Sequence, residues 1–179
     1  MTRVILIAGD SKRFLPDTKR FYSYLTRYVG ILPKEIQKIR TAYLSEITLI
    51  KKMVTAVLEK TDEPLLIVFC GHGRKNGWVM DDSRVFPYIA LSHILLAGTR
   101  PIQLINDCCY AMSVTQKFKK FEVDKKRVSL IGACTANKKT SEGLCEWVIE
   151  RWTHRSSAHH AFSKLIWGTN WDYCFFSAG

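Results

Sequence analysis

Four short apolar runs, separated by stretches with helical spacing, limit this chain to a small set of folds. The runs lie at residues 4–8, 65–70, 102–105 and 128–133, are rich in β-branched residues and end at polar or turn residues. Such runs are typical of strands that are buried on both faces of a sheet. Because helical patterns alternate with them, we predict an α/β fold with a mostly parallel sheet and helices on both faces.

The helical patterns between these runs predict where the covering helices lie. Two of them present a single apolar face, formed in the first by Phe21, Leu25 and Tyr28 and in the second by Ile47, Ile50, Val54 and Val57. Ser45 precedes the second pattern and is expected to cap that helix. Further helices are expected at residues 88–96, 114–121 and 145–167, and short strands at residues 36–40 and 173–176. No repeat or linker interrupts the chain, so residues 1–179 are expected to form one domain.

The chain is strongly basic, with 27 Lys and Arg against 16 Asp and Glu and a formal net charge of +11. Such a charge favours acidic partners and says little about the fold. The basic residues are scattered and no nucleic-acid-binding motif accompanies them, so a solvated basic surface is preferred over a nucleic-acid interface. The sequence does not indicate an oligomeric state.

Six cysteines, at positions 70, 108, 109, 134, 145 and 174, show no C-x-x-C spacing. This argues against a zinc finger or a thioredoxin-like site. Residues 1–30 lack the features of a signal peptide, and the apolar runs are too short to span a bilayer. The sequence therefore predicts reduced thiols in a cytoplasmic protein that does not enter a membrane.

The residues that follow the predicted strands are the candidates for a functional site, because ligands of open α/β sheets bind beyond the carboxyl ends of the strands. In chain order these residues are Gly9-Asp10, Gly71-His72-Gly73, Asp107-Cys108-Cys109 and Cys134-Thr135. A histidine between two glycines and a pair of cysteines are thus expected at the same edge. A thiol nucleophile and a histidine that transfers protons are the groups that covalent catalysis requires.

Three segments occur in an order and spacing typical of one enzyme family: LIVFCGHG at residues 66–73, LINDCC at 104–109 and IGACT at 131–135. They resemble the caspase-like superfamily of cysteine peptidases, and metacaspases most. The resemblance implies a caspase-like three-layer sandwich and an endopeptidase with His72 and Cys109 as its catalytic dyad, without a cofactor or a metal ligand. It also implies an oxyanion hole formed by the backbone N–H groups of Gly73 and Cys109.

The same resemblance implies a substrate preference among proteins and peptides. In metacaspases the acid two residues before the nucleophile and an acid after the first strand line the pocket for the residue that precedes the cut. Asp107 and Asp10 occupy these positions, and Cys70 stands where the family commonly has serine. Two carboxylates attract Arg or Lys and repel Asp. We therefore expect cleavage after basic residues.

One departure from the family pattern follows the predicted nucleophile. The family usually has glycine three residues after it, whereas this chain continues with Tyr110-Ala111-Met112. This keeps a second hypothesis open, in which the chain is a catalytically inactive caspase-like module that binds a protein or nucleic-acid partner.

Activation by calcium and self-processing have weaker support in the sequence. Calcium-dependent metacaspases carry acidic clusters, but Asp81-Asp82 supplies only two of the several oxygen ligands that calcium requires, so a hairpin turn is preferred there. The basic residues 125–127 lie where family members are often cut, and a solvated loop is slightly preferred for them.

Overall fold

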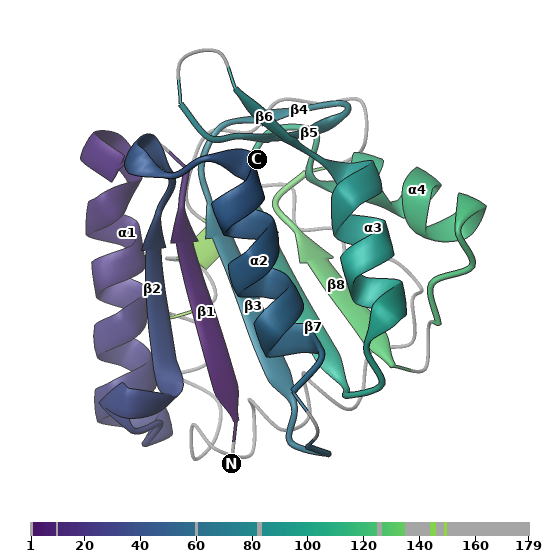
Figure 1. Cartoon of the computed structure of the whole chain (residues 1–179). Helices are drawn as coiled ribbons and strands as arrows, with labels where there is room; N and C mark the ends of the chain where they lie inside the picture. The colour runs from purple at the N-terminus through teal and green to yellow at the C-terminus, as the bar shows by residue number, and fades with distance from the viewer. Residues whose placement is uncertain are drawn as a thin grey trace.

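A five-stranded sheet forms the centre of the computed structural model (Figure 1), which describes residues 2–9, 11–59, 61–81, 84–124, 127–134, 144–145 and 149. Its strands are β1 (Arg3–Ala8), β2 (Ile36–Arg40), β3 (Leu65–Cys70), β7 (Ile102–Asp107) and β8 (Val128–Gly132). They are arranged in the order β2-β1-β3-β7-β8, and each neighbouring pair is parallel. The prediction of a mostly parallel α/β sheet is confirmed, including the short strand at residues 36–40.

Both faces of the sheet are buried, which explains why its strands are continuous apolar runs. All six residues of β3 are buried. Because successive side chains of a strand point to opposite faces, Leu66, Val68 and Cys70 belong to one apolar cluster. Leu65, Ile67 and Phe69 belong to the other.

Helices cover the two faces, so the fold has three layers. The helix α1 (Ser11–Tyr24), continued by a π-helical turn at Leu25–Val29, packs on one face. On the other face lie α2 (Glu46–Val57), α3 (Tyr88–Ala97) and α4 (Val114–Lys120). Short 3-10 turns occur at Pro33–Glu35, Thr41–Tyr43 and Ala111–Ser113.

Two of the predicted helix faces differ from the observed ones. Tyr28 is 63% exposed and Ile47 is 65% exposed, although each was expected to share a buried face. The residues that α2 buries are Leu49, Met53 and Val57, because this helix carries apolar residues on more than one side and its position over the sheet selects the face. The predicted cap is present: the backbone N–H of Thr48 donates to Ser45 Oγ at 3.2 Å.

A small antiparallel sheet, which the sequence did not indicate, lies above the carboxyl ends of the central strands in Figure 1. It consists of β4 (Gly73–Arg74), β5 (Gly77–Val79) and β6 (Val85–Pro87). Its Trp78 is fully buried and stacks on Phe69 of β3, with ring centroids 4.5 Å apart. The ring therefore fixes this sheet onto the end of β3.

Asp81 lies between β5 and β6, in the part of the chain where a hairpin turn was preferred over a calcium ligand. Its carboxylate accepts hydrogen bonds from the backbone N–H and the Nε–H of Arg84, at 3.3 and 2.8 Å. Asp81 thus stabilises the connection between the two strands, while Asp82 lies outside the described residues.

Three other sequence predictions fall largely or wholly outside the described residues. Of the helix expected at residues 145–167, only Cys145 and Ile149 are described, and both are helical. The strand expected at residues 173–176 and the basic residues 125 and 126 are outside.

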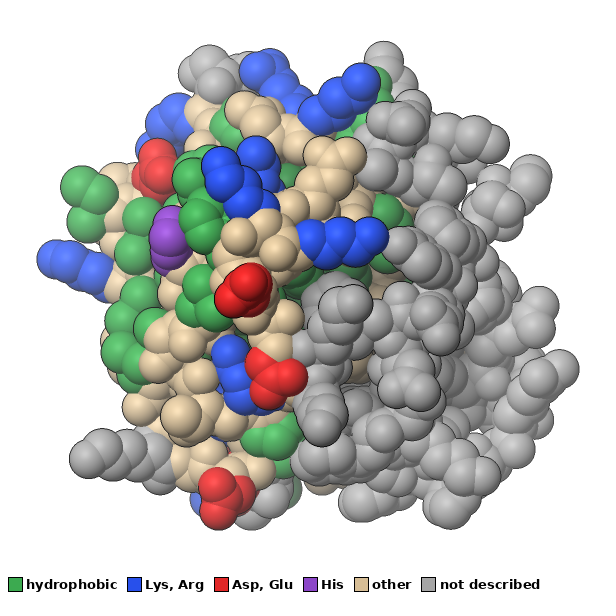
Figure 2. Space-filling model, turned by 90° about the vertical axis from the view of Figure 1, so that its right-hand side faces the viewer, with side chains coloured by type: hydrophobic (Ala, Val, Ile, Leu, Met, Phe, Trp, Pro, Cys, Tyr) green, Lys and Arg blue, Asp and Glu red, His purple; other side chains and the backbone are tan. Residues whose placement is uncertain are grey.

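Within the described ranges, no helix is long and apolar enough to cross a membrane. On the face shown in Figure 2, basic side chains are interspersed with hydrophobic and acidic ones.

Candidate active site

The ends of β3 and β7 bring the predicted catalytic segments together. The two strands are neighbours in register, with Cys70 opposite Asp107. Beyond this pair, the backbone N–H of Gly71 donates to the carbonyl oxygen of Asp107 at 3.1 Å. The segments that carry His72 and Cys109 therefore leave the sheet side by side.

Gly73 lies directly against the cysteine pair. A Cβ atom added at this position would overlap the carbonyl oxygen of Cys109 and lie 2.8 Å from Cys108 Sγ. Both contacts are far closer than ordinary van der Waals packing, so the close approach of the two segments requires glycine here.

Alanine at position 73 is expected to lower the free energy of unfolding by about 2–3 kcal/mol, because the added methyl group meets backbone that cannot rotate away. Chemical denaturation of the wild type and the variant measures this. Gly30→Ala is the comparison, because Gly30 has a φ of +79° but nothing within 4 Å of an added Cβ. It is expected to lose only about 1 kcal/mol through backbone strain. An effect at position 73 no larger than at position 30 would contradict the close packing.

His72 is held from two sides. Its ring meets the ring of Phe14, on α1, edge to face with centroids 5.0 Å apart. Its carbonyl oxygen accepts a hydrogen bond from the backbone N–H of Val79, on β5, at 2.9 Å. His72 is partly exposed.

The two adjacent cysteines lie in different environments. Cys108 is 2% exposed, and its Sγ donates to Asn106 Oδ1 at 3.2 Å and lies 3.6 Å from Tyr88 Oη. Burial raises the pKa of the Cys108 thiol well above its usual value. Cys109 is partly exposed. Cys108 is thus a packing residue, and Cys109 is the one of the pair that solvent can reach.

Asn106 is a site residue that sequence reasoning did not single out. It is fully buried, its Oδ1 accepts from Trp78 Nε1 at 2.7 Å, and its Nδ2 donates to the carbonyl oxygen of Ala111 at 2.7 Å. The side chain therefore joins the small sheet after His72 to the turn after Cys109. An amide inside a strand buried on both faces was the available signal, because such a group needs partners.

The turn after Cys109 contains no glycine, unlike the metacaspase pattern that the sequence resembles. Tyr110 adopts the left-handed conformation, with φ of 55° and ψ of 29°. The side chain of Met112 packs against Gly132 of β8, where an added Cβ would lie 2.7 Å from the Met112 sulfur. The absence of a side chain at Gly132 thus leaves room for the side chain of Met112.

Asp107 and Cys70, two of the three predicted pocket residues, lie together in a buried cluster with Cys145. Cys70 Sγ is 3.1 Å from Cys145 Sγ. The Asp107 carboxylate is 7% exposed and accepts the backbone N–H groups of Leu144 and Cys145, at 3.3 and 3.0 Å. Asp10, the third pocket residue, lies outside the described residues.

The burial of this cluster favours neutral side chains. Burial is the largest influence on the pKa of Asp107 and raises it, although hydrogen bonds with Cys145 and Leu144 act in the opposite direction. The hydrogen bond with Cys145 lowers the pKa of Cys70, but burial and the charge of Asp107 outweigh it. The hydrogen bond with Cys70 and burial raise the pKa of Cys145 well above its usual value.

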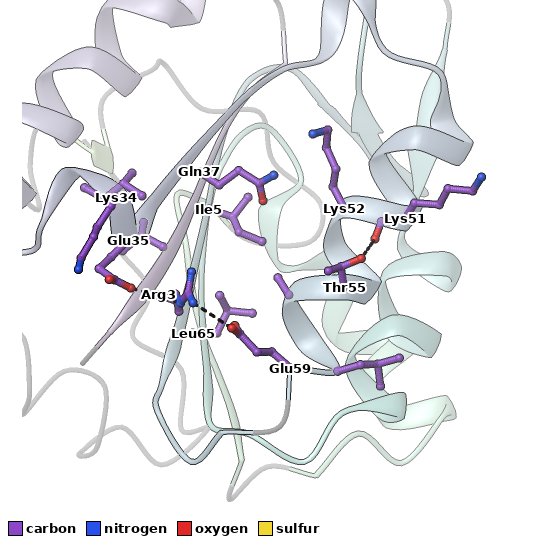
Figure 3. Close-up of a pocket in the computed structure, with 14 residues that line it drawn as sticks. Arg3, Ile5, Lys34, Glu35, Gln37, Lys51, Lys52, Thr55, Glu59 and Leu65 are labelled. Atoms are coloured by element: carbon purple, nitrogen blue, oxygen red, sulfur yellow. Dashed lines mark hydrogen bonds and ion pairs between the residues drawn. The ribbon is translucent and has the colours of Figure 1, made fainter.

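A pocket of about 770 Å³ lies at the other end of the sheet, between α2 and the starts of β1, β2 and β3 (Figure 3). Arg3 crosses it and pairs with Glu35 at 3.2 Å and with Glu59 at 2.9 Å. Since His72 and Cys109 follow the carboxyl ends of the strands, this pocket is not part of the candidate site.

Comparisons with known proteins support the fold alone. No family model and no curated protein matches the chain. Among solved structures, the chain is similar to the crystal structure of Chaetomium thermophilum Raptor, with 16% sequence identity and a TM-score of 0.55. The match covers 80% of this chain and 16% of the Raptor chain. The chain therefore shares an α/β fold with one part of a much longer protein.

Proposed function

We propose that the chain is a cysteine endopeptidase with Cys109 as its nucleophile and His72 as its proton-transfer residue. One observation carries the proposal: the partly exposed Cys109 lies against Gly73, the residue after His72, at the carboxyl edge of a parallel sheet. The burial of Cys108 supports the same assignment, because it leaves one thiol of the pair for chemistry.

The proposed reaction follows the general scheme for thiol nucleophiles. His72 accepts the proton of the Cys109 thiol, and the sulfur attacks the carbonyl carbon of the scissile bond. The backbone N–H groups of Gly73 and Cys109 stabilise the negative charge that forms on the carbonyl oxygen. The C–N bond then breaks, the amine leaves with the proton from His72, and water hydrolyses the thioester to release the acid and restore the thiol.

Asp107 supports a preference for Arg or Lys before the cut. Its carboxylate is held in place by the N–H groups of Leu144 and Cys145, so a substrate cation would meet an oriented acceptor. Burial raises the pKa of Asp107, and a substrate cation beside it would favour the ionised form, whereas a substrate carboxylate would add like-charge repulsion.

Matched fluorogenic peptides that end in Arg, Lys or Asp test the proposal directly. We expect kcat/KM for the Arg and Lys peptides to exceed that for the Asp peptide by at least about 100-fold, since like charges in contact cost several kcal/mol. Each peptide is measured with and without calcium. Cleavage after Asp would support the proposed peptidase activity but refute the proposed preference for Arg or Lys. A folded chain that cleaves none of the peptides would refute the peptidase.

A second candidate function is a non-catalytic caspase-like module that binds a protein or nucleic acid. The turn after Cys109 favours it, because Met112 stands where metacaspases usually have glycine, and Tyr110 adopts a left-handed conformation in the same turn. The net charge of +11 would suit a polyanion. Affinity for nucleic acid that falls steeply with salt, in a chain without peptidase activity, would support this alternative.

We infer that the chain functions in the cytoplasm. Five of its cysteines are described, and none of these five is in a disulfide. Reduced thiols are the usual state in that compartment, and the proposed chemistry needs Cys109 reduced.

A further inference from the structure

Three buried side chains with metal-binding atoms meet beside the candidate active site. They are Cys70 at the end of β3, Asp107 at the end of β7, and Cys145. One ligand atom from each lies within 4.8 Å of the other two. None of the three takes part in the proton transfers proposed for His72 and Cys109.

We propose that Cys70, Asp107 and Cys145 bind a zinc ion. Two thiolates and a carboxylate are ligands that zinc accepts, and three protein ligands with a fourth position for another group is a common zinc arrangement. Thiolates disfavour magnesium and calcium, which prefer oxygen ligands. The segments that supply the ligands are far apart in sequence, so the absence of C-x-x-C spacing does not argue against this site.

The protein holds these ligands in place before a metal arrives. Cys70 and Asp107 are opposite each other on neighbouring strands, and their side chains therefore lie side by side on one face of the sheet. Both carboxylate oxygens of Asp107 accept backbone N–H groups, and each keeps a further lone pair for a metal. Such outer hydrogen bonds orient the ligands of metal sites.

Charge in the neighbourhood also favours a cation. The negative charge of Asp17, on α1, acts on both Cys70 and Asp107. The cluster is enclosed, with Cys70 and Cys145 each 1% exposed. A cation bound there would offset the cost of ionising two thiols and a carboxyl group in a buried position.

Zinc would compete with the substrate if the chain is a peptidase. A metal bound to Asp107 occupies the carboxylate that is proposed to pair with Arg or Lys of the substrate. Zinc would then inhibit cleavage after basic residues. This consequence rests on the proposed function, whereas the zinc site itself does not.

The test measures zinc bound to the full reduced chain after unbound metal is removed, in a Cys109→Ala background so that the proposed nucleophile cannot supply a ligand. We expect one zinc per chain. Adding Cys70→Ser or Cys145→Ser should weaken zinc binding by more than about 100-fold. Changing a residue that only hydrogen-bonds to a metal ligand costs about 10–100-fold, so a larger loss indicates a direct ligand. The matched control is Cys134→Ser, which removes another buried thiol and should leave zinc affinity unchanged.

X-ray absorption of the zinc-loaded wild-type chain tests the ligands without relying on the folding of the variants. We expect two sulfur ligands at about 2.3 Å and oxygen at about 2.0–2.2 Å. Failure to retain zinc, equal affinity in all three serine variants, or a zinc shell without two sulfurs would overturn the proposal. A Cys70–Cys145 disulfide in the freshly purified chain, found by peptide mass spectrometry, would also overturn it.

The peptide assay separates this proposal from the proposed function. A chain that cleaves after Arg but binds no zinc would refute the metal site and leave the peptidase. A chain that binds zinc through these ligands but cleaves no peptide would support the metal site and refute the peptidase.

Discussion

Alanine in place of Cys109 is expected to reduce kcat for the Arg peptide by at least about 10⁴-fold. Removal of the nucleophile from a peptidase that uses a nucleophile and a base costs about 10⁶-fold, and the residual rate comes from substrate binding and the oxyanion hole. The same protein preparation should remain folded, because Cys109 is partly exposed and does not belong to either apolar cluster. Single-turnover cleavage and circular dichroism of the purified variant measure the two effects.

Cys108→Ala is the matched control, since it removes the same group one residue earlier. This variant should keep its activity per folded molecule and lose about 1–2 kcal/mol of unfolding free energy, because a buried sulfur and its hydrogen bond to Asn106 are removed. Loss of cleavage in the Cys108 variant with retention in the Cys109 variant would show that the nucleophile is assigned to the wrong cysteine.

Asn106→Ala is expected to lower the free energy of unfolding by about 2–5 kcal/mol. The change leaves Trp78 Nε1 and the carbonyl oxygen of Ala111 buried without their present partner. Each such orphaned group costs about 1–3 kcal/mol. Since whole domains are stable by only about 5–15 kcal/mol, the loss should be evident in urea or thermal denaturation.

A double-mutant cycle with Trp78→Phe separates the Trp78–Asn106 hydrogen bond from the other hydrogen bonds of the Asn106 side chain. The phenylalanine variant removes the indole N–H together with part of the buried ring, and Asn106 Oδ1 still accepts from Cys108. We expect the double variant to cost less unfolding free energy than the sum of the two single variants, because both single variants remove the same Trp78–Asn106 hydrogen bond. Additive effects would mean that the Trp78–Asn106 hydrogen bond does not contribute to stability.

The strands of the central sheet could be predicted because burial on both faces produces uninterrupted apolar runs. The predicted residues 65–70 and 36–40 coincide with β3 and β2. The predicted end of β7 fell two residues early, at residue 105, because Asn106 and Asp107 are polar although both are buried. A search for apolar runs places the end of a strand too early when the last residues of that strand are polar.

The small antiparallel sheet could not be predicted from its composition. β4 has only two residues and β5 and β6 have three each, too few to show an alternating pattern. What holds them is Trp78, which stacks on Phe69 and bonds to Asn106, and both partners are distant in sequence. The exposure of Ile47 also depends on tertiary packing, because the position of α2 over the sheet decides which side of the helix is buried.

The sequence placed His72 and Cys109 at one edge because parallel strands all end on the same side of a sheet. Their roles in catalysis stay predictions, as does the role of Asp107 in specificity. Cys145 was not associated with the site, since only the fold brings it to 3.1 Å from Cys70. Residues that are far apart in the sequence and meet only in the fold do not form a motif with a fixed spacing, so the sequence alone does not reveal their contact.

The parallel arrangement of the central sheet has a consequence for how the chain folds. Helices or the small sheet separate each pair of neighbouring strands along the chain, so every pairing must close a long loop before it gains contacts. We therefore expect folding to be slow for a chain of this size. β3 pairs on both sides, and its amides should exchange with solvent only on global opening. The proposed catalytic segments are thus anchored to the part of the molecule that opens least often.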